Sequence, residues 1–263
     1  MAAMRLTILG CSGSLSGPRS PASGYLVEVE GFAPVVLDMG PGVLGALQRH
    51  VRPQDATILL SHLHADHCLD LPSLLVWRRY GPAAHENGVN PLFGPSNTAF
   101  RIGVASAEEP GTVDDITDTF LLRTWDVEPE VELPPLTGEG PGIVVRATRV
   151  EHPPESYGLR LTEPSGRSLA YSGDSSYCEA LVELSEGADV LLCEASWTHE
   201  GDKPPGMHMS GLEAGRVAAR AGVGRLVLTH IPPWTDAEAV AEEARAEFSG
   251  EVLVAEPDLG VTI

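Results

Sequence analysis

The chain has 263 residues, 43% of them hydrophobic, and a formal net charge of −20. This length suits one domain with a sizeable core, which we expect to span residues 1–263. The 17 basic residues against 37 acidic ones disfavour tRNA as a partner, because nucleic-acid affinity comes mostly from lysine and arginine contacts with phosphates. The sequence has no apolar run of about 18 residues, so we expect no membrane span.

The start of the chain and its cysteines indicate a cytoplasmic protein. The apolar segment at residues 4–9 predicts a first strand rather than a secretory signal. The four cysteines are scattered without a CxxC pair, which is typical of reduced thiols in the cytosol.

Apolar segments of strand length come before segments of helical spacing in each half of the chain. The first half predicts strands at residues 4–9, 24–30, 34–38 and 57–60, and helices at residues 43–50 and 71–80. Residues 108–142, rich in proline, glycine and acidic side chains, predict an exposed excursion with strands at residues 119–125 and 130–133.

The second half repeats this order. It predicts strands at residues 143–151, 157–163, 168–172, 190–193 and 225–229, and helices at residues 210–221 and 236–248. Ser210 and Thr235 are the expected capping residues of the two helices. Strands first and helices later in each half favour two sheets packed face to face, with helices outside, over a doubly wound parallel sheet.

One motif directly after the predicted strand at residues 57–60 carries most of the chemical information: His62-Leu63-His64-Ala65-Asp66-His67. Because side chains alternate at a strand end, His62 and His64 lie on one side and can reach one metal ion. Asp66 and His67 lie one turn further on, where they suit a second ion nearby. Imidazole and carboxylate together favour zinc or manganese over calcium or magnesium.

Further residues of metal-binding type stand at the carboxyl ends of other predicted strands: Asp38, His152, Asp174 and His230. His208 stands just before a predicted helix. Each is a weak signal alone. Strand ends gather at one edge of a sheet, so their common placement predicts one shared site.

The order of these motifs resembles the metallo-β-lactamase superfamily, and more closely its ribonuclease Z branch. The resemblance rests on Leu37-Asp38-Met39-Gly40, the histidine-rich motif, His152, Ser172-Gly173-Asp174, His208 and Thr229-His230. The runs Leu9-Gly10-Cys11-Ser12-Gly13 and Cys193-Glu194-Ala195 also match that branch. Longer stretches, at residues 20–25, 74–80 and 194–199, are similar to short actinobacterial members described as cyclic-nucleotide phosphodiesterases.

This resemblance implies an α/β (α+β) fold, an αββα sandwich of two mixed sheets with helices outside and two divalent metal ions between them. The ligand set suits zinc and manganese alike; we expect zinc, with manganese as the alternative. The family pattern gives one ion His62, His64 and His152. It gives the other ion Asp66, His67 and His230, with Asp174 bridging both.

The resemblance also implies roles around the metals. Asp38 would accept the ring N–H of a ligand histidine and so orient it. His208 would be a catalytic histidine outside the metals, Glu194 its orienting partner, and Asp66 belongs to the catalytic set as well. His50, His85 and His199 match no part of the pattern.

The expected reaction is phosphodiester hydrolysis by a metal-bound hydroxide. His152 and Asp174 are only 22 positions apart, which leaves no room for the arm with which bacterial ribonuclease Z holds tRNA. Residues 108–139 carry ten acidic side chains and one basic one, Arg123. Both features favour a small cyclic phosphodiester, 3′,5′-cyclic AMP converted to 5′-AMP.

Hydrolysis of another small phosphodiester or another hydrolysis known in the superfamily stays open at this point, and so do two further functions. One is a tRNA 3′ endonuclease of the ribonuclease Z type. The other is a metal-containing binding or accessory module without activity, since fold alone does not fix function. Relatives in this family are often dimers, so we expect a homodimer.

Overall fold

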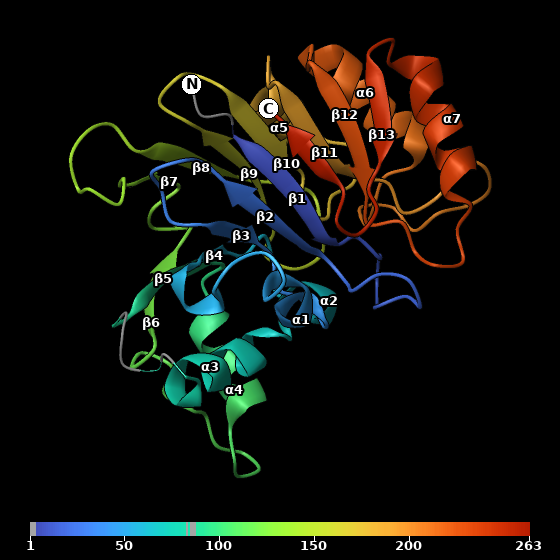
Figure 1. Cartoon of the computed structure of the whole chain (residues 1–263). Coiled ribbons are helices and arrows are strands. Elements are labelled where there is room, and N and C mark those ends of the chain that lie inside the picture. Colours follow the sequence, from blue (N-terminus) through green and yellow to red (C-terminus); the bar gives the residue numbers. More distant parts are fainter. Residues whose placement is uncertain (1–3, 83, 85–87) are drawn as a thin grey trace.

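Two seven-stranded sheets face each other in the computed structural model, which describes residues 4–82, 84 and 88–263 (Figure 1). The first sheet has the order β14-β1-β2-β3-β4-β5-β6 and the second β13-β12-β11-β10-β9-β8-β7. In the first sheet, the pairs from β14 to β3 are antiparallel and those from β3 to β6 parallel. The second sheet repeats this, antiparallel from β7 to β10 and parallel from β10 to β13.

The strands of the first sheet are β1 Arg5–Gly10, β2 Gly24–Glu28, β3 Val35–Leu37, β4 Thr57–Leu59, β5 Asn90–Gly94, β6 Phe120–Thr124 and β14 Gly260–Thr262. Those of the second are β7 Glu130–Leu133, β8 Ile143–Arg149, β9 Tyr157–Thr162, β10 Ser168–Tyr171, β11 Val190–Glu194, β12 Arg225–Thr229 and β13 Glu251–Val254.

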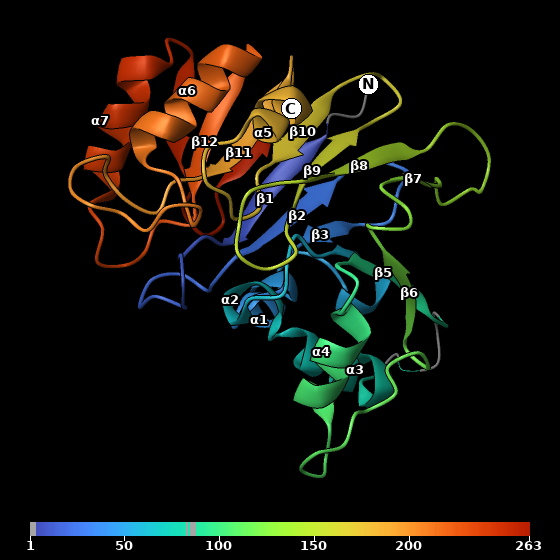
Figure 2. The ribbon, with the colours of Figure 1, turned by 180° about the vertical axis from the view of Figure 1, so that it is seen from behind.

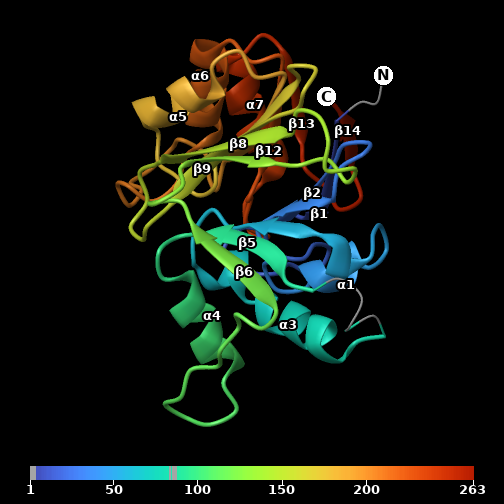
Figure 3. The same ribbon diagram turned by 90° about the vertical axis from the view of Figure 1, so that its left-hand side faces the viewer.

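Helices cover the outer face of each sheet, as the views from behind and from the side show (Figures 2 and 3). The first sheet carries α1 Val43–Leu47, α2 Ala65–Cys68, α3 Leu71–Tyr80 and α4 Thr98–Ser106. The second carries α5 Glu179–Ser185, α6 Gly211–Ala221 and α7 Ala237–Glu247. A short 3₁₀ helix at Pro53–Asp55 precedes β4. The predicted αββα sandwich of two mixed sheets is therefore confirmed.

Alternation along the central strands builds three apolar layers. In β11, Leu192 packs into the core between the sheets, whereas its neighbour Leu191 packs outward under the helices. In β1, Ile8 points into the inter-sheet core and Leu9 toward the helices of the first sheet. Strands buried on both faces are nearly continuous in apolar residues, which is why they could be recognised in the sequence.

Most predicted elements are present with ends shifted by one to three residues, and some elements were missed. The sequence analysis overlooked α2, β5, α4, α5, β13 and β14. β5 contains Pro91, a residue that usually marks a break, and α5 has only seven residues. The expected cap Thr235 is wrong, because the side chain of Asp236 accepts the backbone N–H groups of Glu238 and Ala239 at the start of α7.

The acidic segment at residues 108–142 is the crossover between the sheets rather than a simple excursion. Its strand β6 pairs with β5 in the first sheet, and β7 pairs with β8 in the second. Within the described part of the chain, no helix combines the length and the apolar character that crossing a bilayer requires.

Candidate metal centre

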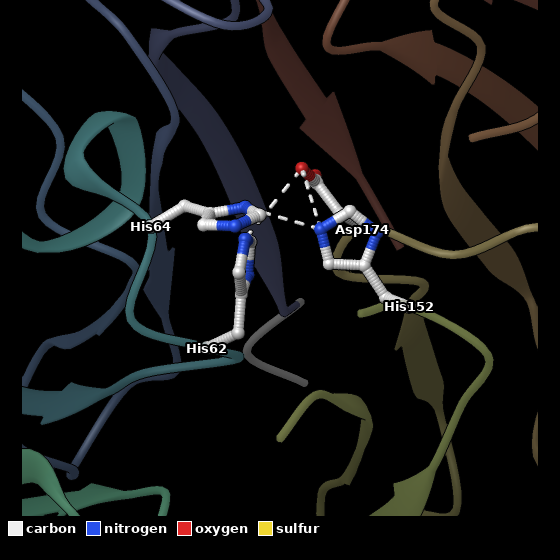
Figure 4. A group of neighbouring side chains, drawn as sticks. All are labelled: His62, His64, His152 and Asp174. Atoms are coloured by element: carbon white, nitrogen blue, oxygen red, sulfur yellow. Dashed lines mark hydrogen bonds and ion pairs between the residues drawn. The ribbon is translucent and has the colours of Figure 1, made fainter. Parts of the chain in front are cut away.

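The carboxyl ends of strands from both sheets converge on one cluster of histidines and aspartates. His62 and His64 follow β4, His152 follows β8, and Asp174 follows β10. In Figure 4, the first two approach from one half of the chain and the last two from the other, and the four side chains point toward one another. These residues therefore lie together, as their placement at strand ends predicted.

The first group can hold one ion. The Nε2 atom of His152 lies 3.1 Å from Nδ1 of His64 and 4.0 Å from Oδ2 of Asp174. Nε2 of His62 lies 3.6 Å from the same Asp174 oxygen. Ligand atoms about 2.0–2.2 Å from a tetrahedral ion stand about 3.4 Å apart, so these spacings match a single divalent ion.

The second group shares Asp174 with the first and adds Asp66, His67 and His230. Nε2 of His230 lies 3.1 Å from Oδ2 of Asp66 and 3.4 Å from Oδ2 of Asp174. Nε2 of His67 lies 3.2 Å from Oδ1 of Asp174. The Asp174 carboxylate thus stands between the two groups, where a bridging ligand belongs.

Buried polar atoms without partners show that this cluster fits a cation. Nε2 of His62, Nε2 of His67 and Oδ1 of Asp174 are buried and make no hydrogen bond to any described residue. Such atoms are costly unless something satisfies them. All three point into the cluster, and a metal ion would take up their lone pairs.

The charge states in the cluster also suit a cation. Burial lowers the pKa of His62 well below its ordinary value and that of His152 to about 4, so both imidazoles are neutral at pH 7. Burial opposes ionisation of Asp174, but the flanking His230 and His67 outweigh it and hold the pKa of this carboxyl well below its ordinary range. Burial opposes the charged form of His67, but Asp174 and Asp38 outweigh it and raise the pKa of this imidazole well above its ordinary value, so a bound cation would replace its second proton.

Hydrogen bonds behind the ligands fix which ring nitrogen faces the centre. Nδ1 of His67 donates to Oδ2 of Asp38 at 2.8 Å, and Nδ1 of His152 donates to the carbonyl of Met207 at 2.6 Å. Since these nitrogens carry the proton of the neutral ring, Nε2 of each ring faces the cluster and presents a lone pair to it when the ring is neutral. Asp38 thus accepts the ring N–H of His67, a candidate ligand, which is the contact that the sequence analysis expected.

Asp38 itself is held by three further donors. Its carboxylate accepts the backbone N–H and the hydroxyl of Ser61, both at 2.7 Å, and the hydroxyl of Tyr171 at 2.7 Å. The sequence analysis missed Ser61 and Tyr171. Their position next to Ser172-Gly173-Asp174 and the histidine-rich motif was the available signal, but a buried tyrosine or serine usually belongs to the core.

Local backbone strain marks the same place. Asp38 and His230 have φ values of 60° and 55°, in the left-handed region that non-glycine residues rarely adopt. Gly40 has no room for a side chain, because a Cβ there would collide with the carbonyl of Asp66. The glycine of the Leu37-Asp38-Met39-Gly40 motif thus lets the two loops approach closely.

His208 and Glu194 form a pair beside the cluster. Nδ1 of His208 lies 3.0 Å from Oε1 of Glu194 and 3.8 Å from Oδ2 of Asp174. Burial opposes the charged imidazole, but Glu194 outweighs it and raises the pKa of His208 to about 9. His208 is thus an imidazolium at neutral pH, able to donate a proton toward the centre.

Glu194 is fully buried and saturated with donors. It accepts the backbone N–H groups of Ser175 and Met209 and the hydroxyl of Ser196. These bonds hold its carboxylate in one orientation, so it fixes His208 rather than moving with it. Glu194, His208 and His230 also form a third group of possible metal ligands. Glu194 is less available to a metal ion than the other carboxylates, because its oxygens already accept these hydrogen bonds.

Two further described histidines, His50 and His199, belong to none of the three groups. His50 contacts the exposed Asp258, and the ring of His199 contacts the hydroxyl of Ser210. His85 lies outside the described residues. Cys68, next to the histidine-rich motif, is buried, and its thiol faces the carbonyl of Leu63.

Comparison with known proteins shows which family the chain belongs to. Residues 34–231 match the family described as Beta-lactamase superfamily domain. The chain belongs to this superfamily. It is 57% identical to Uncharacterized protein Rv1339 of Mycobacterium tuberculosis, over 95% of this chain and 88% of the relative. It is 30% identical to Probable metallo-hydrolase YhfI of Bacillus subtilis, over 96% and 97% of the two chains.

Solved structures and further homologues agree with this membership. The crystal structure of the metallo-beta-lactamase fold protein YhfI from Bacillus subtilis covers 99% of this chain and 100% of its own, with a TM-score of 0.84 and 27% identity. Ribonuclease Z of Streptomyces avermitilis is 28% identical over 320 aligned positions, 100% of this chain and 99% of the relative. The homologues of this superfamily member thus include a ribonuclease Z, as the motif order indicated.

The Asp174→Ala variant should lose bound metal, because it removes the carboxylate shared by both groups. Plasma mass spectrometry of the protein after zinc loading and desalting measures the metal content. Asp126→Ala, which removes an exposed carboxylate near β6, should leave it unchanged. An Asp174→Ala protein that keeps two ions would refute the bridging position.

Asp38→Asn should weaken metal affinity about 10–100-fold, because the amide no longer holds His67 with a full negative charge. Competition with a zinc-binding dye measures the affinity. Tyr171→Phe, which removes one donor from Asp38 and leaves its charge, should have a smaller effect. Equal affinities for the wild type and Asp38→Asn would remove Asp38 from the site.

Proposed function

We propose that this protein is a metal-dependent phosphodiesterase that converts 3′,5′-cyclic AMP to 5′-AMP. The observation that carries the proposal is the pair of ligand groups sharing Asp174, with the protonated His208 beside them. Two cation positions and a proton donor on one side are what hydrolysis of a phosphodiester requires. The expected ion is zinc, with manganese as the alternative.

The ligands would divide as the family pattern suggests. One ion would be held by His62, His64 and His152, the other by Asp66, His67 and His230, and Asp174 would contact both. When bound, the two ions would supply Lewis-acid activation of water and neutralise charge on the phosphate oxygens. The chain's own part is to fix these ligands and to exclude water from behind them.

His208 would supply the proton. Its side chain is 12% exposed, so it borders both the buried cluster and the solvent from which a substrate arrives. Its Nδ1 is engaged by Glu194, which leaves Nε2 free to donate to the oxygen that leaves phosphorus. Glu194 would keep the ring in this orientation and stabilise its positive charge.

The compact segment between His152 and Asp174 supports a small substrate. It consists of β9 and β10, which pair as an antiparallel hairpin, and a turn in which Glu163 and Arg167 hydrogen-bond through their backbones. No arm long enough to embrace a folded RNA leaves this segment. A cyclic nucleotide needs no such arm, because it is a small molecule whose phosphodiester is part of a single ring.

A tRNA 3′ endonuclease activity is the second candidate, favoured by the 28% identity to a ribonuclease Z. The net charge of −20 and the acidic crossover at residues 108–142 weigh against it. The homodimer expected for this family is also part of the proposal, and light scattering tests it.

Product analysis tests the proposed reaction. Purified protein loaded with zinc or manganese is incubated with 3′,5′-cyclic AMP, and 5′-AMP is followed by chromatography. We expect 5′-AMP from the wild type and none from Asp174→Ala. Metal-loaded wild type without product would reject this substrate, and a tRNA precursor with a 3′ trailer would be tested next.

His208→Ala should retain both ions and lose about 10²–10⁴-fold in rate, because it removes a proton donor and not a ligand. Metal content and initial rates are measured on the same preparation. If the metal content falls together with the rate, His208 is a ligand and not the proton donor.

A further inference from the structure

The side chains of the cluster differ in their exposure to solvent, and those of His208 and Asp66 are 12% and 11% exposed. His62, His67, His230 and Asp174 are buried, whereas His64 and His208 are half-buried. We take the side of His64 and His208, where the cluster meets solvent, as the entrance for a substrate. The residues that surround His208 form part of this entrance.

Trp197 and the loop at residues 198–208 border the entrance next to His208. The indole ring of Trp197 meets the His208 ring edge-on, with centroids 5.3 Å apart. Backbone hydrogen bonds from Ser196 to Met209 and from Gly211 to Trp197 fasten the two ends of the loop. Near its end, the carbonyl of Met207 accepts the ring N–H of His152, so the loop is tied to the ligand set.

This loop carries Lys203, the only lysine in the sequence. Its side chain is exposed, and its Nζ lies over the Trp197 ring, 5.7 Å from the ring centroid. Attraction between the ammonium and the indole face holds the charge beside the entrance. Trp197 thus contacts both Lys203 and His208.

Many exposed arginines are paired with a carboxylate, whereas Lys203, like Arg5, Arg19 and Arg101, has no ion pair among the described residues. Arg49, Arg216 and Arg245, for example, each contact a carboxylate. Among the described residues, no carboxylate oxygen forms an ion pair with Lys203, although Glu200 and Asp202 belong to the same loop. Its ammonium is therefore available to an anion from solution.

The net charge of −20 disfavours binding of an anionic substrate, and a cation at this place opposes that effect. The protein as a whole repels an anionic substrate, and only charges within about 8 Å act strongly at physiological salt. A local ammonium beside the entrance offsets that repulsion where the substrate enters. Three rotatable donors on a flexible stem suit a phosphate oxygen.

We propose that Lys203, held over Trp197, is a substrate-binding residue that contacts the phosphate of a phosphate ester entering the site. This inference rests on the proposed phosphodiesterase function and adds a recognition residue to it. Lys203 acts on binding of the substrate and of the product and leaves the chemical step to the metals and His208.

Chemical protection of the single lysine tests this contact without turnover. The zinc-loaded protein is treated with limiting N-hydroxysuccinimide acetate, and mass spectrometry follows acetylation of the Lys203 peptide. We expect 5′-AMP to slow the acetylation at least threefold, and adenosine, which has the same base and ribose without the phosphate, to leave it unchanged. Equal rates with 5′-AMP and adenosine would overturn the proposal.

Kinetics on matched variants separate a local contact from an effect of net charge. Lys203→Ala should raise KM for 3′,5′-cyclic AMP about tenfold with kcat within twofold, and Lys203→Arg should restore most of the affinity. Arg216→Ala removes the same charge from the outer surface of α6 and should leave KM unchanged. A similar rise in KM for Arg216→Ala, or a fall in kcat alone for Lys203→Ala, would overturn the proposal.

These two experiments keep the inference separable from the proposed function. Hydrolysis by the wild type together with no protection by 5′-AMP rejects the role of Lys203 and leaves the phosphodiesterase standing. Protection by 5′-AMP without hydrolysis of cyclic AMP supports Lys203 as a phosphate contact and rejects only the proposed substrate.

Discussion

Burying a carboxylate is costly unless hydrogen-bond donors or positive charges surround it, and this chain buries Asp38, Asp66 and Asp174 at one place. Asp38 is satisfied by donors from both sheets, since Ser61 follows β4 and Tyr171 ends β10. Asp174 keeps a buried oxygen without a hydrogen bond among the described residues. The sandwich is thus closed around negative charge that a divalent cation would balance.

The fold explains why these groups meet. Each sheet ends its antiparallel part and begins its parallel part at the middle, at β3 in one and β10 in the other. Asp38 and Asp174 follow these two strands, so the equivalent position in each half supplies a carboxylate to the same centre. The unusual φ values at Asp38 and His230 show that the loops there are held by their contacts rather than by local preference.

The sequence predicted the sandwich and the convergence of the ligands, because buried strands are continuous in apolar residues and His62, His64 and Asp174 stand directly after such strands. It did not predict β5, because Pro91 lies inside that strand and proline usually marks a break. It placed the cap of α7 at Thr235 because Thr235 and Asp236 are both capping residue types. Tyr171 and Lys203 were missed for another reason. Tyr171 contacts Asp38, which lies 133 positions away in the sequence. Lys203 contacts the nearby Trp197, but only the fold of the loop brings its ammonium over the ring.

Metal binding and substrate binding have different physical origins in this proposal. Buried carboxylates would hold the metals, and the exposed charge of Lys203 at the entrance would select an anionic ligand. The first is the central claim, and crystals grown with zinc test it most directly through anomalous diffraction on both sides of the zinc edge. We predict two anomalous peaks, each about 2.0–2.2 Å from the ligand atoms of one group, with the Asp174 carboxylate between them. A single peak, or peaks away from these side chains, would contradict the two-metal centre.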